Sequence, residues 1–132
     1  MNTQEYKDFF ENLSKDTPIE EYENIFSIKA KFEDPFHKVE GVQEIYNVFK
    51  MMYKKLDSPI FKVKEIVENS NIAYFKWDFY FYFKNKTKKQ SFEGVSRIEF
   101  DKEGKVVSHV DYWDSAKTYM RKFHFYQHYL VF

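Results

Sequence analysis

The chain has 132 residues, of which 43% are hydrophobic, and its 21 basic residues are balanced by 21 acidic ones. This length and apolar content predict one domain, residues 1–132, with a buried core, and the balanced charge gives no field that favours nucleic acid or an anionic membrane surface. The absence of cysteine excludes disulfides, thiolate nucleophiles and cysteine-type zinc sites, and with the polar opening segment 1–5 it indicates a cytoplasmic protein without a signal peptide.

The apolar residues are unusually aromatic: Phe, Tyr and Trp make up 22% of the chain, against three Gly and three Pro. Large aromatic side chains fill a core efficiently, and they also line the apolar clefts that bind small molecules. Both interpretations, core packing alone and a ligand pocket, are open at this point. No window approaches the roughly 18 consecutive apolar residues that a membrane span needs, so no membrane partner is predicted.

The first third of the chain predicts two helices and a strand. Apolar residues recur at helical spacing from Thr3 to Leu13 and again from Ile19 to Phe26, where Thr17 and Pro18 suit a helix start. From Phe26 the apolar residues alternate with polar ones up to Asp34, which is typical of a half-buried strand.

The rest of the chain predicts a long helix and then four strands. Val42 to Leu56 has a wide apolar stripe at helical spacing. After the turn at 57–59 the expected strands are Phe61 to Glu68, Ile72 to Phe83, Ser91 to Phe100 and Val106 to Trp113, joined by short polar hairpin turns. Ser115 is a candidate cap for a last helix running toward Tyr126.

This order predicts an α+β fold in which helices pack on one face of a curved mixed or antiparallel sheet, with a cavity between the two layers. In the strand from Ile72 to Phe83, one face carries a row of Phe with Trp77, and the other carries Tyr74, Tyr80 and Tyr82. An exposed aromatic ladder of this size is unusual on a monomer. We therefore expect a homodimer that forms through the sheet.

The segment Glu33-Asp34-Pro35 places a carboxylate at the end of an apolar strand. Because proline biases the residue before it toward extended backbone, Asp34 is expected to keep the direction of the strand and to face the cavity. The alternative is that Asp34 accepts hydrogen bonds from amides of its own loop, an ordinary role for Asp in turns. His37 lies in the same loop and could face either the cavity mouth or water.

The order of elements, the Glu33-Asp34-Pro35 loop, the glycine before the long helix and the entry Gly104-Lys105-Val106 into the last strand resemble the nuclear transport factor 2-like (NTF2-like) superfamily. These are α+β cone proteins that include ketosteroid isomerase and the SnoaL-like polyketide cyclases, and the resemblance covers essentially the whole chain. It implies a curved sheet wrapped around the helices, with an apolar pocket inside the cone.

The resemblance also implies roles for single residues. Asp34 stands where the isomerase has its general base, but Phe10 and Ser96 stand where that enzyme has its tyrosine and protonated-acid donors. Neither residue replaces those donors, and losing one such donor costs on the order of a hundredfold in rate. Steroid isomerisation is therefore not expected, while Tyr6, one turn before Phe10, is a candidate substitute hydroxyl.

On the last strand, alternation places His109, Asp111 and Trp113 on one face. If this face lines the cone, His109 and Asp111 form a titratable pair able to move protons near neutral pH. A satisfied polar pair within a core is the alternative. Trp77 and Trp113 are expected to form core or pocket wall.

We therefore hypothesise a protein that binds a hydrophobic small molecule, with Asp34, His109 and Asp111 as candidate catalytic residues. The ligand-binding candidates are Tyr6, Phe10, His37, Trp77, Ser96 and Trp113. An enzyme with this site would be a cofactor-free isomerase, cyclase or dehydratase acting by proton transfer. The alternative is a non-catalytic ligand-binding, protein-interaction or dimerisation module. No metal site, cofactor or nucleic-acid partner is predicted.

Overall fold

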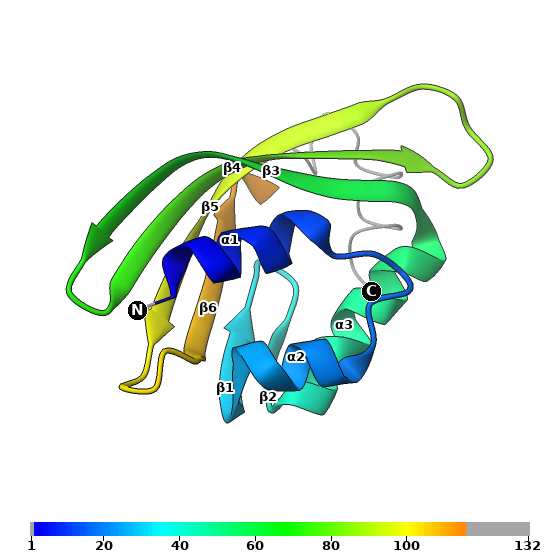
Figure 1. The fold of residues 1–132 in the computed structure, drawn as a ribbon. Helices are drawn as coiled ribbons and strands as arrows, with labels where there is room; N and C mark the ends of the chain where they lie inside the picture. Colours follow the sequence, from blue (N-terminus) through cyan, green and yellow to red (C-terminus); the bar gives the residue numbers. More distant parts are fainter. Residues whose placement is uncertain (1, 116–132) are drawn as a thin grey trace.

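The protein is described by a computed structural model that covers residues 2–115. Three helices lie on the concave side of a curved six-stranded sheet (Figure 1). The elements are α1 (Thr3–Asn12), α2 (Ile19–Ile25), β1 (Phe26–Glu33), β2 (Lys38–Glu40), α3 (Val42–Lys55), β3 (Leu56–Asn69), β4 (Ile72–Phe83), β5 (Gln90–Phe100) and β6 (Val106–Trp113).

The strand order is β2-β1-β6-β5-β4-β3. The four C-terminal strands form an antiparallel meander, whereas β1 pairs with β6 in parallel and β2 pairs with β1 antiparallel. This arrangement confirms the predicted α+β cone. It brings β1 and β6, which are distant in sequence, to neighbouring positions in the sheet.

Two features of the sheet differ from the prediction. β3 begins at Leu56, not at Phe61. Ser58 takes a positive φ of 50°, and the pairing with β4 shifts register between Asp57 and Ile60, which lets the strand continue through Pro59. An edge strand tolerates a proline there since its outer N–H groups need no partner. The short strand Lys38–Glu40 was missed because three residues are too few to show alternation.

The long helix α3 starts at a glycine that the backbone requires. Gly41 has φ = 98°, a conformation in which L side chains are strained. The apolar stripe of α3 is buried against the sheet, and Lys54 and Lys55 occupy its last turn, where cations interact favourably with the helix dipole.

The inward face of β4 supplies most of the core, as the alternation predicted. Its buried residues are Ala73, Phe75, Trp77, Phe79, Phe81 and Phe83. Opposite Trp77 on β5 lies Gly94, and a Cβ at this glycine would come within 2.5 Å of the indole ring. The indole therefore lies directly over the backbone of β5, and Gly94 fixes where Trp77 points.

No helix within residues 2–115 is long and apolar enough to cross a bilayer. The helix expected between Ser115 and Tyr126 lies, beyond its first residue, outside the described residues.

Candidate functional site

A continuous chain of hydrogen-bonded side chains runs through the core of the cone. His109 on β6 is completely buried, and its two ring nitrogens have different partners. Nδ1 lies 2.6 Å from the hydroxyl of Tyr6 on α1. Nε2 lies 2.6 Å from Oδ1 of Asp111, two residues along the same strand. The chain thus ties the first helix to the centre of the sheet.

The chain continues from Asp111 across the sheet. Ser96 on β5 lies directly opposite Asp111 in the strand register, and its hydroxyl donates to the same Oδ1 atom. Ser96 in turn accepts a hydrogen bond of 2.8 Å from Nε1 of Trp77 on β4. The neighbouring strands β4, β5 and β6, with α1 packed on them, therefore bring these residues together in the order Trp77, Ser96, Asp111, His109 and Tyr6.

The proton positions along this chain can be assigned by matching each hydrogen-bond donor to an acceptor. Asp111 accepts at Oδ1 from Ser96 and from Nε2–H of His109, so Nδ1 of a neutral His109 accepts from the Tyr6 hydroxyl. An imidazolium would need Tyr6 to accept at Nδ1–H, which leaves the buried hydroxyl hydrogen without an acceptor among the described residues, at a cost of about 1–3 kcal/mol. We assign His109 as the neutral Nε2–H tautomer.

Tyr6 is held in its neutral form. Burial, followed by the nearby charge of Asp111, raises the pKa of the Tyr6 hydroxyl well above its ordinary value. Tyr6 therefore acts as a permanent hydrogen-bond donor to His109 and not as a group that titrates.

Next to this chain lies a cavity of about 30 Å³, partly open to solvent. Two carboxylates, Asp34 and Asp111, reach the cavity from the ends of β1 and β6. Its other lining residues are apolar or aromatic: Phe32, Val48, Phe49, Phe61, Trp77, Phe79, Phe92 and Trp113.

The two carboxylates have different hydrogen-bonding states. Oδ1 of Asp34 accepts from the backbone N–H groups of Phe36 and His37, at 2.8 and 2.7 Å, and Nδ1 of His37 lies 2.9 and 3.0 Å from its two oxygens. Asp34 thus holds its own loop together and also lines the cavity, which joins the two roles that the sequence left open.

Among the described residues, hydrogen-bond donors reach only one of the two carboxylate oxygens of Asp111. Both of its hydrogen bonds fall on Oδ1, and within residues 2–115 no hydrogen bond reaches Oδ2. The indole Nε1–H of Trp113, also in the cavity wall, is buried and has no hydrogen-bond partner in the same part of the chain. One acceptor and one donor are therefore available to a bound molecule.

The remaining predicted residues lie around this centre. Phe10 packs on the ring of Phe61 at 4.4 Å and on His109 at 5.5 Å but does not line the cavity. Ser96 and His109 do not line the cavity but are hydrogen-bonded to Asp111, which does. His37 is hydrogen-bonded to Asp34. Of the nine predicted residues, Asp34, Asp111, Trp77 and Trp113 line the cavity itself.

The aromatic walls were only partly predicted. The alternation of β4 and β1 could have identified Phe79 and Phe32, because they share faces with Trp77 and Asp34. Phe49 on α3 and Phe61 on β3 give no such signal, since their helix and strand patterns show only that they are buried.

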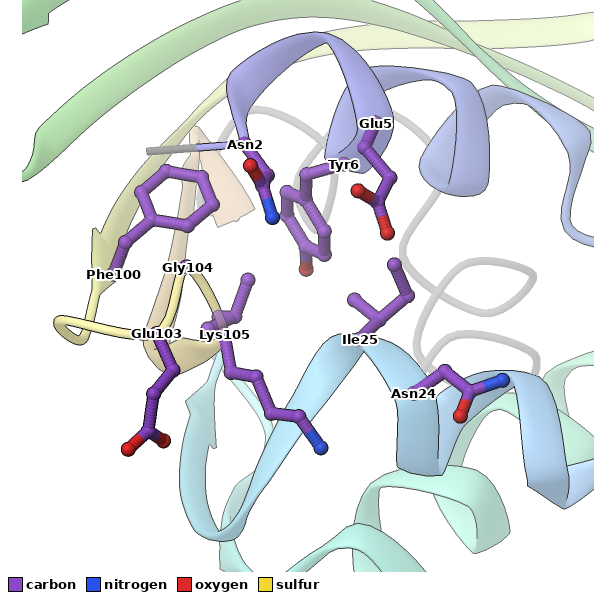
Figure 2. Close-up of a pocket in the computed structure, with 10 residues that line it drawn as sticks. Asn2, Glu5, Tyr6, Asn24, Ile25, Phe100, Glu103, Gly104 and Lys105 are labelled. Atoms are coloured by element: carbon purple, nitrogen blue, oxygen red, sulfur yellow. The ribbon is translucent and has the colours of Figure 1, made fainter.

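A second cavity of about 80 Å³ lies between the start of α1, the end of α2 and the turn that joins β5 to β6 (Figure 2). Tyr6, which does not line the first cavity, lines this one, with polar neighbours that include Asn2, Glu5, Asn24 and Lys105. Within residues 2–115 no group of three or more acidic or histidine side chains could hold a metal ion.

The curved sheet, the helices on its concave side and the acidic cavity between them define an NTF2-like cone protein. Its residues 6–109 match the model of the SnoaL-like domain family. The chain therefore belongs to the SnoaL-like domain family.

Solved structures with the same fold share little sequence with the chain. A candidate SnoaL-like polyketide cyclase from Jannaschia sp. CCS1 superposes with a TM-score of 0.76 at 9% identity, covering 89% of this chain and 88% of that one. An NTF2-like protein of unknown function from Burkholderia pseudomallei gives 0.74 at 13% identity, covering 89% and 92%.

A hypothetical protein from Catenulispora acidiphila with a ketosteroid isomerase-like fold, solved in complex with trimethylamine, gives a TM-score of 0.72 at 7% identity, covering 85% and 84%. Comparison with curated proteins gave no significant match. At these identities the likeness to solved structures establishes the fold alone.

Proposed function

We propose that this protein binds a small organic molecule in the cone cavity and that Asp111 transfers a proton there without a cofactor. The observation that carries the proposal is the state of Asp111: its carboxylate is fixed at Oδ1 by Ser96 and His109, while Oδ2 receives no hydrogen bond within residues 2–115. A carboxylate held this way inside an apolar wall is suited to act as a base.

The proposed reaction is an isomerisation, cyclisation or dehydration that passes through an enol. Asp111 takes the proton from carbon, and the indole N–H of Trp113 donates to the oxygen on which charge develops. His109 touches neither cavity, so it serves as a positioning residue that orients Asp111. Asp34 forms the second acidic wall and keeps the loop after β1 in place.

The comparisons support a small-molecule site in this fold. One neighbour was solved with trimethylamine and another is a candidate polyketide cyclase. A non-catalytic binding module is the second candidate, and the observation that favours it is the small volume of the cavity, about 30 Å³.

Deuterium incorporation into cyclohexanone in D₂O, followed by proton NMR, tests the proposal directly. We expect exchange above the buffer rate, reduced about 100-fold or more in Asp111→Asn, because a general base contributes factors of this order. The control Asp78→Asn changes a carboxylate on the outer face of the sheet, where it pairs with Lys76, and should keep the wild-type rate. Ligand binding without exchange in the wild type would favour the binding module.

The second part of the proposal is a homodimer through the outer face of the sheet. Tyr74, Tyr112 and Val67 are 44%, 58% and 63% exposed there. We expect sedimentation velocity to give a dimer, and Tyr112→Asp to shift it toward monomer. Met51→Glu on α3, a comparably exposed apolar residue at 42%, is the control that should leave the dimer intact. A monomeric wild type would overturn this part.

A further inference from the structure

We infer that the cone cavity receives an organic cation, and that the ligand is a small alkylammonium compound with an oxygen close to its nitrogen. The inference rests on the proposal that the cone cavity is the ligand site. It does not depend on whether Asp111 transfers a proton there.

The first argument is charge. Among residues 2–115, the ionisable side chains that line the cavity are Asp34 and Asp111, and no Lys or Arg of this part of the chain lines it. Asp34 is already compensated by two backbone N–H groups and by His37. Within residues 2–115, Asp111 receives hydrogen bonds on Oδ1 alone. A carboxylate oxygen in an apolar cavity is costly without a donor or a cation beside it, so a cationic group gains most from this position and a carboxylate or phosphate ligand is repelled.

The second argument is the chemistry of the walls. Seven aromatic side chains line the cavity with the carboxylates, and several lie close together. Phe61 is 4.5 Å from Phe79 and 5.2 Å from Trp77, and Phe92 is 5.4 Å from Trp113, between ring centroids. The remaining rings are Phe32 and Phe49. Aromatic faces attract a cation within about 6 Å of the ring centroid, and aromatic cages bind methylated ammonium groups in this way.

The third argument concerns size and the remaining donor. A volume of about 30 Å³ admits a head group of few heavy atoms, and the partly open side lets the rest of the ligand project outward. The buried Nε1–H of Trp113 lacks a partner among the described residues and needs an acceptor. An oxygen near the ammonium nitrogen supplies this acceptor, which points to amino-alcohol or amino-ketone compounds.

Two probes of the same shape test the inference. Choline and 3,3-dimethylbutan-1-ol differ in that the first has a quaternary nitrogen where the second has a carbon, so they separate charge from shape. Ethanolamine serves as a smaller cation. The chain has two tryptophans, Trp77 and Trp113, and both line the cavity. Their two indole N–H signals in a proton–nitrogen NMR spectrum therefore report binding at this site.

We expect choline or ethanolamine to shift both indole signals and to bind at least about tenfold more tightly than the neutral alcohol. Asp111→Asn should weaken the cation at least about tenfold and leave the alcohol unchanged, whereas the outer-face control Asp78→Asn should change neither. If Asp111→Asn does not fold, the pair of probes on the wild-type protein decides the question alone.

Three outcomes would overturn the inference. Equal affinity for choline and the neutral alcohol shows that charge is not recognised, and it leaves the cavity as a small-molecule site. Cation binding that Asp111→Asn and Asp78→Asn affect equally places the cation elsewhere. If none of the three probes shifts the indole signals, the cation assignment fails while the ketone exchange assay still tests the proposed function separately.

Discussion

Replacing Tyr6 by phenylalanine removes one oxygen from the core and tests the assigned protons of the hydrogen-bonded chain. Tyr6 and His109 are 2% and 0% exposed, and 2.6 Å separates the hydroxyl from Nδ1. Tyr6→Phe therefore takes away the donor of a buried acceptor, Nδ1 of His109. We expect Tyr6→Phe to cost about 1–3 kcal/mol of unfolding free energy, or about 3–10 °C in Tm for a domain of this size.

The matched control is Tyr22→Phe. Tyr22 is 1% exposed, and within residues 2–115 its hydroxyl makes no hydrogen bond to another side chain or to the backbone, so removing this oxygen should cost less than about 0.5 kcal/mol. Urea denaturation of both variants gives the comparison. Nitrogen NMR of the wild-type imidazole should show a neutral His109 with its proton on Nε2. Equal costs for the two variants, or an imidazolium at pH 7, would refute the assigned chain.

Three further predictions concern pH, the indole and the loop. Burial raises the pKa of Tyr22 and Tyr53, so these tyrosines ionise at lower pH in the unfolded chain than in the folded protein. The free energy of unfolding should therefore be unaffected by them below about pH 10 and should fall above it by about 1.4 kcal/mol per pH unit for each such tyrosine. Urea denaturation measures this slope, and Tyr22→Phe should reduce it. Gly94→Ala forces a Cβ to within 2.5 Å of the indole of Trp77 and should cost about 1–3 kcal/mol with a changed near-ultraviolet circular dichroism spectrum; an unchanged spectrum contradicts it. Asp34→Ala removes the acceptor of two loop amides and should cost about 1–3 kcal/mol of unfolding free energy in the same urea denaturation assay. Asp34→Asn keeps an acceptor oxygen and should cost about half as much. Equal costs for the two variants would mean that the loop does not depend on this acceptor.

The fold was predictable because its elements carry strong periodicity. The alternation of β4 and the stripe of α3 each determine which face is buried, and the order of elements then restricts the topology. What alternation could not provide was contact between elements distant in sequence. Tyr6 meets His109 across 103 positions, and this contact exists because α1 crosses the concave face in front of β6. The sequence suggested Tyr6 as a substitute donor to a substrate, whereas its hydroxyl serves a histidine in the core.

The two carboxylates of the cavity show why position along a strand does not by itself assign a chemical role. Asp34 occupies the place in which the resemblance implies a base, but its loop surrounds it with donors on both oxygens. Within residues 2–115, Asp111 has donors on one oxygen alone, so its other oxygen can take a proton from a bound molecule without displacing a hydrogen bond. The proposed base therefore lies on β6 and not after β1. Ser96, which stands where the resemblance implies a donor to the substrate, is hydrogen-bonded to Asp111 instead and supports it.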